Sequence, residues 1–148
     1  MSSDNKELLV SGIERTKQWF EQAIPEPTDE HKSIQLGCHI EEVAEMLSAV
    51  DLHEWAHDID LLATDLKVGD DSVSNLSINR KELLDSLADQ IVTAVGVAHM
   101  FGMDISGALE EVNRSNFSKF ENGKPVFDDN GKITKGKDYT PPSLKPYI

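Results

Sequence analysis

The chain has 148 residues, of which 39% are hydrophobic, and it carries a formal net charge of −13 and a single cysteine. These values predict one ordinary domain with a modest core, and the negative charge disfavours nucleic acid and anionic membrane surfaces as partners. The lone Cys38 excludes an internal disulfide and fits a reducing compartment. No signal-peptide pattern is present, and the most apolar run, 91–103, is too short and interrupted to span a bilayer, so we expect a cytoplasmic protein.

Apolar residues recur at helical spacing along most of the chain, which predicts an all-α protein. The first helix is expected from Asp4, a capping residue, to the break at Pro25 and Pro27. A second helix is expected over 33–50 and a shorter third helix over 53–66.

Two more helices follow a polar loop. The fourth is expected to begin at the capping residue Asn79, with Glu82 closing a capping box, and to end at Gly102. Asp104 then caps a fifth helix that extends to about Lys119.

The composition changes after the fifth helix, which separates a helical part (1–120) from an extended C-terminal arm (121–148) of the same domain. The sequence Asp129-Asn130-Gly131 lies between two short apolar segments and predicts a small hairpin. The arm and its start are rich in lysine, at positions Lys119, Lys124, Lys132, Lys135, Lys137 and Lys145.

The sequence HEWAH at 53–57 matches the HExxH pattern of zinc peptidases. On a helix, His53 and His57 share one face, and Glu54 is available as a base. A zinc peptidase also requires a third protein ligand and a substrate cleft, and His99 is the only histidine further along the chain. We therefore interpret the match as accidental and keep a zinc hydrolase only as an alternative.

Two groups of carboxylates have a spacing that suggests chemistry. Glu41, Glu42 and Glu45 meet on one turn of the second helix, and Asp85 and Asp89 are i,i+4 neighbours in the most apolar helix. Solvated surface acids are the alternative for either group alone. If the two helices are antiparallel neighbours, the rows can face each other and offer hard oxygen ligands for Mg²⁺ or Mn²⁺.

The two groups resemble the acidic motifs of the all-α nucleoside triphosphate pyrophosphohydrolases, in particular the MazG-like branch. The EExxE motif matches residues 41–45, and the second motif, usually ExxD, matches the DSLAD segment. Two alignments are open, one that uses Asp85 and Asp89 and one that uses Glu82 and Asp85. We prefer the first. The segment 102–120 and the Gly/Lys-rich tail resemble short stand-alone members from bacteria and their phages.

The resemblance implies an antiparallel helical bundle that assembles as a homodimer or homotetramer. It also implies two or three Mg²⁺ ions, with Mn²⁺ as a substitute, at Glu41, Glu42, Glu45, Asp85 and Asp89. A metal-activated water would attack the α-phosphorus of a nucleoside triphosphate, with a deoxynucleoside triphosphate expected, and Glu41 or Glu42 would act as the base.

Candidate substrate-binding residues follow in part from the same resemblance. The arm is expected to cover the site and to become ordered only with substrate. The alternative for Trp19 is a position in the core, which its place on the apolar stripe of the first helix favours. The alternative for Arg114, Lys124, Lys135 and Lys137 is a solubilising surface charge. The alternative hypothesis for the function of the chain is a non-catalytic acidic helical adaptor. The substrate candidates are Trp19, Gln35, His39, Asn113, Arg114, Asn116, Lys119, Lys124, Lys135 and Lys137.

Overall fold

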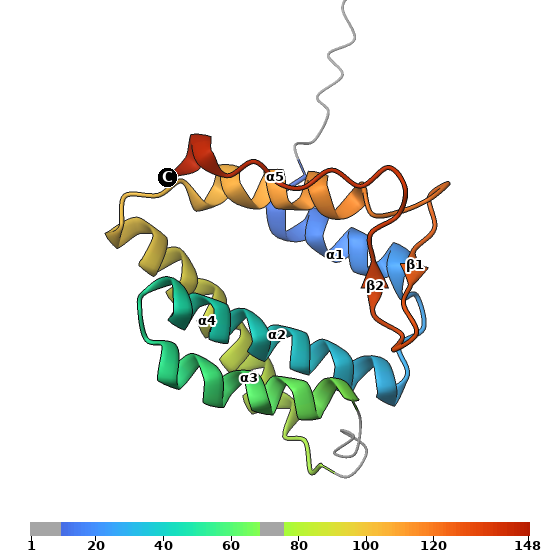
Figure 1. The fold of residues 1–148 in the computed structure, drawn as a ribbon, viewed down its shortest axis with the longest axis horizontal. Helices are drawn as coiled ribbons and strands as arrows, with labels where there is room; N and C mark the ends of the chain where they lie inside the picture. Colours follow the sequence, from blue (N-terminus) through green and yellow to red (C-terminus); the bar gives the residue numbers. More distant parts are fainter. Residues whose placement is uncertain (1–9, 69–75) are drawn as a thin grey trace, which may run out of the picture. The chain divides into compact units, whose positions relative to one another are not determined.

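The computed structural model of the protein describes residues 10–68 and 76–148. In this part of the chain there are five α-helices and one two-stranded hairpin (Figure 1). The predicted all-α fold with a small hairpin near the C-terminus is therefore confirmed.

The chain divides into two compact units. The first unit comprises the chain up to Pro25 together with Lys81–Val126 and Ile133–Ile148. The second unit comprises Glu26–Arg80 and Phe127–Lys132. Helices α1, α4 and α5 thus belong to the first unit, apart from the first residue of α4, and helices α2 and α3 belong to the second.

The first helix begins later than the sequence predicts. Helix α1 spans Gly12–Ala23, and the hydroxyl of Ser11 caps it by accepting a hydrogen bond from the backbone N–H of Glu14 at 3.2 Å. The predicted cap, Asp4, lies outside the described residues. A single uninterrupted helix from Asp4 is nevertheless wrong, because Ser11 has non-helical backbone angles and starts a helix of its own.

Helices α4 and α5 are separated where the sequence predicts. Helix α4 spans Arg80–Met100, and Gly102 follows with a φ of +73°, a conformation that glycine adopts without strain. Helix α5 spans Ile105–Phe117. Its cap is the predicted one, since the Asp104 carboxylate accepts a hydrogen bond from the backbone N–H of Gly107 at 3.0 Å.

An aromatic cluster joins α1 to the end of α5 in the first unit. Trp19, Ala23 and Phe120 are buried, and the rings of Trp19 and Phe120 stack with centroids 5.6 Å apart and planes 8° apart. Stacked aromatic pairs add to the energy of apolar burial. The partly buried residues that pack against this cluster are Phe20, Ile24, Phe117 and Ile133.

The C-terminal residues are docked along α5, as Figure 1 shows for the segment that leads to the C-terminus. Arg114 donates hydrogen bonds to the Thr140 hydroxyl at 2.6 Å and to the carbonyl oxygen of Pro141 at 3.1 Å. Glu111 accepts a hydrogen bond from the backbone N–H of Ser143 at 2.8 Å. The expectation that the whole arm becomes ordered only with substrate is therefore wrong for this segment, which α5 already holds.

The last turn of the chain also depends on α5. The 3₁₀ helix η2 spans Lys145–Tyr147, and the Tyr147 carbonyl accepts a hydrogen bond from the backbone N–H of Asp104 at 2.9 Å. A Cβ on Gly107 would lie 2.6 Å from Cε1 of the Tyr147 ring. Glycine at this position therefore allows the tail to approach the helix.

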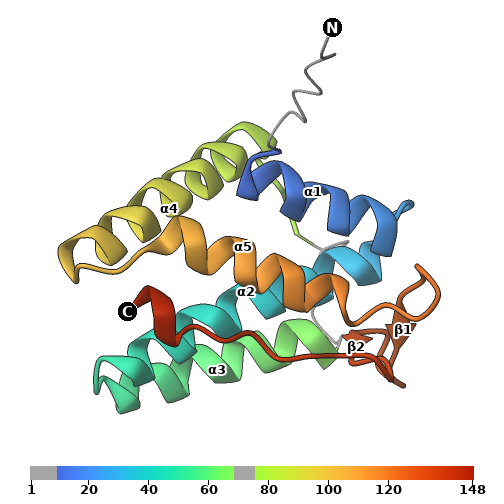
Figure 2. The same ribbon diagram turned by 90° about the horizontal axis from the view of Figure 1, so that it is seen from above.

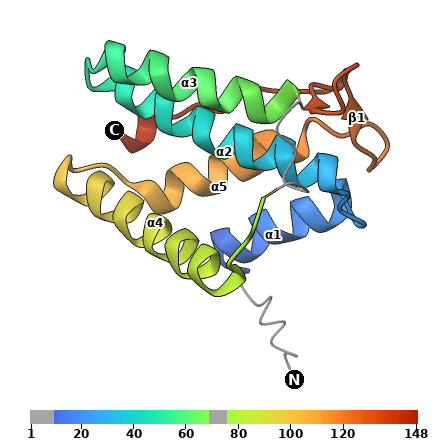
Figure 3. The ribbon, with the colours of Figure 1, turned by 90° about the horizontal axis from the view of Figure 1, so that it is seen from below.

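The second unit is built on two helices that lie side by side in Figures 1, 2 and 3. Helix α2 spans Asp29–Ala49, and helix α3 spans His53–Val68. Helix α2 begins one turn before the predicted Ser33, because Thr28 and His31 form a capping box in which imidazole takes the role usually filled by Glu or Gln.

The two helices approach most closely at Gly37. A Cβ on this residue would lie 2.7 Å from Cγ of Lys67 and 2.8 Å from the carbonyl oxygen of Ala63. The buried hydroxyl of Ser33 donates a hydrogen bond to the carbonyl of Leu66 at 2.8 Å in the same contact. Small residues on α2 therefore set the distance between the helices.

Replacing Gly37 by Ala should destabilise the protein by about 1 to 2 kcal/mol. The added methyl group overlaps a backbone oxygen, which moves only if α3 moves, and this cost exceeds the roughly 1 kcal/mol gain in helix propensity. Gln35→Ala, at an exposed position on the same helix, is the control and should change stability little. Urea unfolding measures both variants, and equal stability of Gly37→Ala and wild type would contradict the tight contact.

The hairpin forms where it is predicted. Strand β1 spans Val126–Phe127 and pairs with β2, which spans Ile133–Thr134. Between them Gly131 has a φ of +77°, and the Asp128 carboxylate accepts a hydrogen bond from the backbone N–H of Lys132 at 2.9 Å. The turn thus holds Lys132 at a fixed place next to α2 within the second unit.

Among the described residues, none of the individual helices has both the length and the apolar character needed to cross a membrane. Helices α4 and α5 meet that criterion only as a pair, and the pair is bent by 117° at the break.

Candidate functional site

The first acidic motif lies on the C-terminal half of α2, and its three glutamates have different environments. Glu42 and Glu45 are exposed, whereas the side chain of Glu41 is only 25% exposed. The Glu41 carboxylate lies 2.6 Å from Nζ of Lys67 on α3 and 3.5 Å from Nζ of Lys132 in the hairpin turn. Each of its two oxygens therefore faces an ammonium group.

These contacts change the chemistry of Glu41. The hydrogen bond from Lys67 holds the pKa of Glu41 below its ordinary value of 4.5, although partial burial acts in the opposite direction, and Lys132 adds to the lowering. An ammonium group already compensates the charge at each oxygen of this carboxylate. We therefore assign Glu41 to a structural ion pair, and this arrangement does not support its predicted roles as metal ligand and base.

Replacing Lys67 by Met should lower the free energy of unfolding by about 1 to 2 kcal/mol at pH 7, because Glu41 loses a charged hydrogen bond. The ion pair lowers the pKa of Glu41 in the folded state, so its stabilisation is present above pH 4.5 and is lost as the pH falls through the folded-state pKa. The difference between wild type and variant should therefore shrink below pH 4.5, as urea unfolding at several pH values would measure.

The matched control is Lys17→Met on α1, where an exposed lysine lies 3.5 Å from Glu21. Such a surface pair contributes little, so this variant should stay within about 0.5 kcal/mol of wild type. A loss in Lys67→Met that is the same at every pH would contradict the assigned ion pair.

Glu45 lines an open groove between α2 and α3, within the second unit. The groove has a volume of about 630 Å³. Its floor includes the buried side chains of Ala44 and Ala56, and its polar lining includes Glu45 and residues of α3. The remaining lining residues are Ser48, Ala49, His53, His57 and Asp60. The predicted metal ligand therefore borders on both histidines of the HEWAH sequence.

The second acidic row lies on α4 and is exposed. Asp85, Asp89 and Glu82, which the second alignment of the motif uses, all have exposed side chains. This row belongs to the first unit, whereas the glutamates of α2 belong to the second. That the two rows of carboxylates face each other therefore stays a prediction. In residues 10–68 and 76–148, no group of three or more His, Cys, Asp or Glu side chains is placed to hold a metal ion.

Two of the predicted substrate residues are part of the first unit's interior. Trp19 is 7% exposed and stacks on Phe120, so it is a core residue and not a stacking platform for a base. Asn113 is 1% exposed. Its side-chain oxygen accepts a hydrogen bond from Thr16 at 2.9 Å, and its side-chain nitrogen donates to the Gly12 carbonyl at 2.9 Å. Asn113 therefore ties α5 to α1, which corrects its predicted role.

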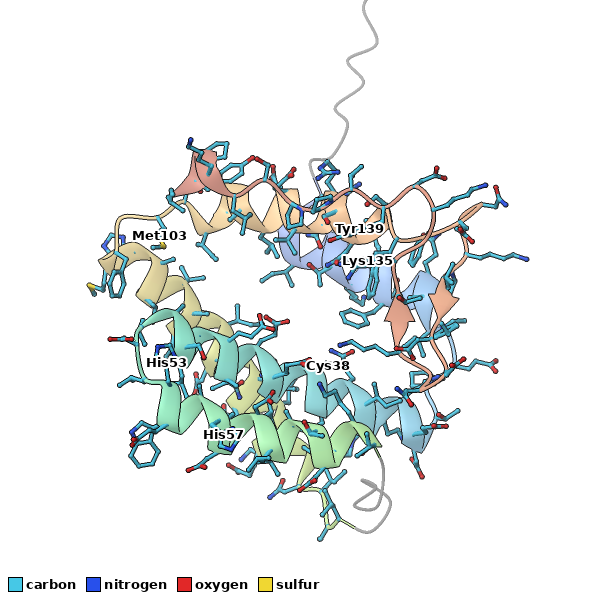
Figure 4. All side chains as sticks on the ribbon, in the orientation of Figure 1. Cys38, His53, His57, Met103, Lys135 and Tyr139 are labelled. Atoms are coloured by element: carbon cyan, nitrogen blue, oxygen red, sulfur yellow. The ribbon has the colours of Figure 1, made fainter. Side chains whose placement is uncertain are left out.

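One of the basic candidates has a structural role, and three others remain candidates for binding substrate. Arg114 has a structural role, because Glu111 receives hydrogen bonds from it at 2.8 Å and it also holds the C-terminal segment. The ammonium group of Lys135 lies 5.0 Å from the ring centroid of Tyr139 (Figure 4). Lys124 and Lys137 have exposed side chains. These three lysines remain candidates for phosphate binding.

The other predicted substrate residues keep their places as candidates. Gln35 is exposed on α2, and His39 and Asn116 are partly buried. The ammonium group of Lys119 lies 5.9 Å from the ring centroid of Trp19. Their predicted contact with a nucleotide stays a prediction.

Sequence reasoning missed three residues of the acidic region. Lys67 and Lys132 neutralise Glu41, and Asp60 lines the open groove beside Glu45. Lys67 and Lys132 are 26 and 91 positions away from Glu41. No local pattern signals such pairs, whereas Asp60 had a signal, since it lies three residues after His57 on the same helix.

Comparison with known proteins gives no match to a family model, to a curated protein or to a solved structure.

Proposed function

We propose that the protein hydrolyses a nucleoside triphosphate, with a deoxynucleoside triphosphate as the expected substrate, to the monophosphate and pyrophosphate in the presence of Mg²⁺. The resemblance of the two acidic motifs carries the proposal. The observation that supports it is the solvent exposure of Glu42 and Glu45 on α2 and of Asp85 and Asp89 on α4, since a metal-phosphate complex requires accessible carboxylates.

The chemistry of these donors fits the implied metal. Four exposed carboxylates offer hard oxygen ligands, which Mg²⁺ prefers, and Mn²⁺ accepts the same set. We leave Glu41 out of the set because two ammonium groups already hold it. Bound Mg²⁺ would place positive charge on the triphosphate and lower the pKa of a bound water.

The protein's own residues would orient the reaction. Glu42 replaces Glu41 as our candidate base, because it is exposed and shares a helical turn with Glu45. It would accept a proton from the water as the water oxygen forms a bond to the α-phosphorus. The bond between the α-phosphorus and the oxygen that bridges the α- and β-phosphates breaks at the same time, and pyrophosphate leaves with that oxygen. Lys124, Lys135 and Lys137 would neutralise the departing pyrophosphate.

The reaction class is tested with the full-length chain, Mg²⁺ and each nucleoside triphosphate in ¹⁸O-labelled water. Attack at the α-phosphorus places one ¹⁸O in the monophosphate and none in the pyrophosphate. Release of unlabelled monophosphate, or release of inorganic phosphate with a diphosphate, would rule out the proposed chemistry.

We also propose that α4 joins copies of the chain into a dimer or tetramer, in the cytoplasm of a bacterium or of a phage host. Leu84, Val92 and Met100 are 70%, 68% and 82% exposed on this helix. A helix with apolar residues around most of its circumference is normally buried. A second copy would remove these side chains from water without adding any other component.

Replacing both Leu84 and Val92 by Glu should convert the assembly into a monomer of 16.4 kDa in light scattering. The control is Val68→Glu on α3, where an equally apolar side chain is 70% exposed. A wild-type chain that is already monomeric would contradict the proposed assembly.

The same apolar side chains favour a second candidate, a non-catalytic acidic helical adaptor. The adaptor predicts that the purified chain releases no pyrophosphate from any nucleoside triphosphate and that Glu42→Gln leaves its interactions unchanged.

A further inference from the structure

The turn of the hairpin places a lysine beside the first acidic motif. Nζ of Lys132 lies 3.5 Å from Oε2 of Glu41, and the side chain of Lys132 is 47% exposed. Glu45 lies four residues further along α2, so it is a neighbour of Glu41 on one face of the helix. All three residues belong to the second unit. Lys132 therefore brings a positive charge to the row of carboxylates that includes a proposed metal ligand.

Hydrogen bonds within the turn fix the backbone of Lys132. Oδ1 of Asp128 accepts hydrogen bonds from the backbone N–H groups of Asn130 and Lys132, both at 2.9 Å. The backbone N–H of Asp128 donates to the Lys132 carbonyl at 2.9 Å, which closes the turn from the other side. Asp side chains that bond to the backbone a few residues further on commonly hold turns of this kind. A ligand of Lys132 therefore does not have to order the backbone that carries it.

Glu41 does not occupy Lys132 fully. Nζ of Lys67 lies closer to the carboxylate, at 2.6 Å, and the side chain of Lys67 is more deeply buried than that of Lys132. One carboxylate thus faces two ammonium groups. The 3.5 Å contact of Lys132 is at the outer limit for a hydrogen bond, and an ammonium group has three donors. Lys132 can turn toward an anion while Lys67 keeps Glu41 paired.

A groove in the second unit gives an anion access to Lys132. The groove has a volume of about 210 Å³ and is lined by residues of α2, α3 and the hairpin turn. Its lining includes both lysines, the hydroxyl of Thr64 and the side-chain amide of Asn130, and the last two groups can also donate hydrogen bonds to phosphate oxygens. Asp128 lines it as well, but its Oδ1 is held by the N–H groups of the turn.

The other lysine candidates of the arm are not placed in this way. Lys124, Lys135 and Lys137 belong to the first unit, whereas the acidic motif on α2 belongs to the second. We propose that Lys132 is a phosphate-binding residue of the site, and that its ammonium group holds an oxygen of the β- or γ-phosphate of the triphosphate. This inference rests on the proposed function. A lysine suits the task because its ammonium group is a compact charge on a flexible side chain.

The experiment titrates the full-length chain with pyrophosphate in the presence of Mg²⁺ in a calorimeter, because pyrophosphate contains both outer phosphates and no base. Lys132→Met should weaken binding by about tenfold, as expected for the loss of one hydrogen bond between charged groups. Lys132→Arg keeps the charge and should restore most of the affinity. Lys32→Met is the matched control, since it removes an exposed lysine that is paired with Asp29 at 2.7 Å on the same helix α2, and it should bind as wild type.

Two further measurements distinguish phosphate binding from a structural role. Lys132→Met should keep the melting temperature of wild type, because its contact with Glu41 is long and partly exposed. In steady-state kinetics the same variant should raise KM for the triphosphate by about tenfold and change kcat less. A contact made equally in the bound substrate and in the transition state has this effect.

Equal affinity for pyrophosphate in Lys132→Met and wild type would overturn the inference, as would failure of the wild-type chain to bind pyrophosphate. A weaker binding that is accompanied by a matching loss of stability would assign Lys132 to the fold and would also overturn it. Pyrophosphate release with the same KM in both chains would contradict this inference alone. A wild-type chain that binds pyrophosphate through Lys132 but cleaves no triphosphate would contradict only the proposed reaction.

Discussion

Glu42→Gln, Glu45→Gln and Asp89→Asn should each reduce Mg²⁺-dependent pyrophosphate release by about 10² to 10³-fold while leaving the helical circular dichroism unchanged. Each substitution keeps the size of the side chain and removes one negative charge that the proposed reaction needs for its metal ions. Loss of a single group that stabilises charge in a transition state typically has an effect of this size. Steady-state kinetics at saturating Mg²⁺ measure it.

The control for these variants is Glu110→Gln, which removes an exposed carboxylate from α5 and should leave turnover unchanged. Near-normal activity in any two of the three acidic variants would contradict the proposed metal site.

Glu41→Gln distinguishes the role of Glu41 from that of the other two glutamates of the motif. It should lose the pH-dependent stabilisation by Lys67 and retain more activity than Glu42→Gln, because Glu41 is held by lysines and not left for a metal ion.

Removal of the arm after Phe120 should destabilise the first unit by about 3 to 5 kcal/mol, since several hydrogen bonds to α5 and the packing of Ile133 on the aromatic cluster are lost together. An arm that became ordered only with substrate, as the sequence predicts, would leave the helices unchanged when it is removed. The docked arm predicts the opposite result. A decrease in melting temperature of about 10 °C or more should be seen by calorimetry.

Glu111→Gln tests the same contact without shortening the chain. Hydrogen bonds from Arg114 and from the backbone N–H of Ser143 lower the pKa of Glu111 from 4.5 to about 2. The stabilisation by this carboxylate is therefore present above pH 4.5 and is lost as the pH falls toward 2. The variant should be less stable than wild type at pH 7 and should approach it in acid. An unchanged melting temperature in both variants would show that the arm contributes nothing to the fold.

Much of the fold could be predicted because the signals are local. The caps at Asp104 and Gly102 and the turn before β2 each depend on a few neighbouring residues, and all of them form as expected. The start of α2 was missed because His31 fills a capping role that the usual pattern assigns to Glu or Gln. The start of α1 was missed because Ser11, and not an earlier residue, caps the described helix.

The site could be predicted only as a set of residue types. The sequence indicates that Glu41, Glu42 and Glu45 share a helical turn, but it cannot indicate that Lys67 and Lys132 approach one of them from distant segments. It likewise cannot distinguish an exposed Asn from Asn113, which two hydrogen bonds to α1 bury. Such differences arise from tertiary contacts, which have no local pattern.

The positions of the two tryptophans make the units optically distinguishable. Trp19 is buried in the first unit beside Phe120, and Trp55 is 67% exposed on α3 of the second. A Trp55→Phe chain would report through fluorescence on the first unit alone, and its emission should shift to longer wavelengths only when that unit opens. A Trp19→Phe chain would follow the second unit through a signal that is already close to that of a solvated indole. Denaturant titrations of the two chains would therefore reveal whether the units unfold together or one after the other.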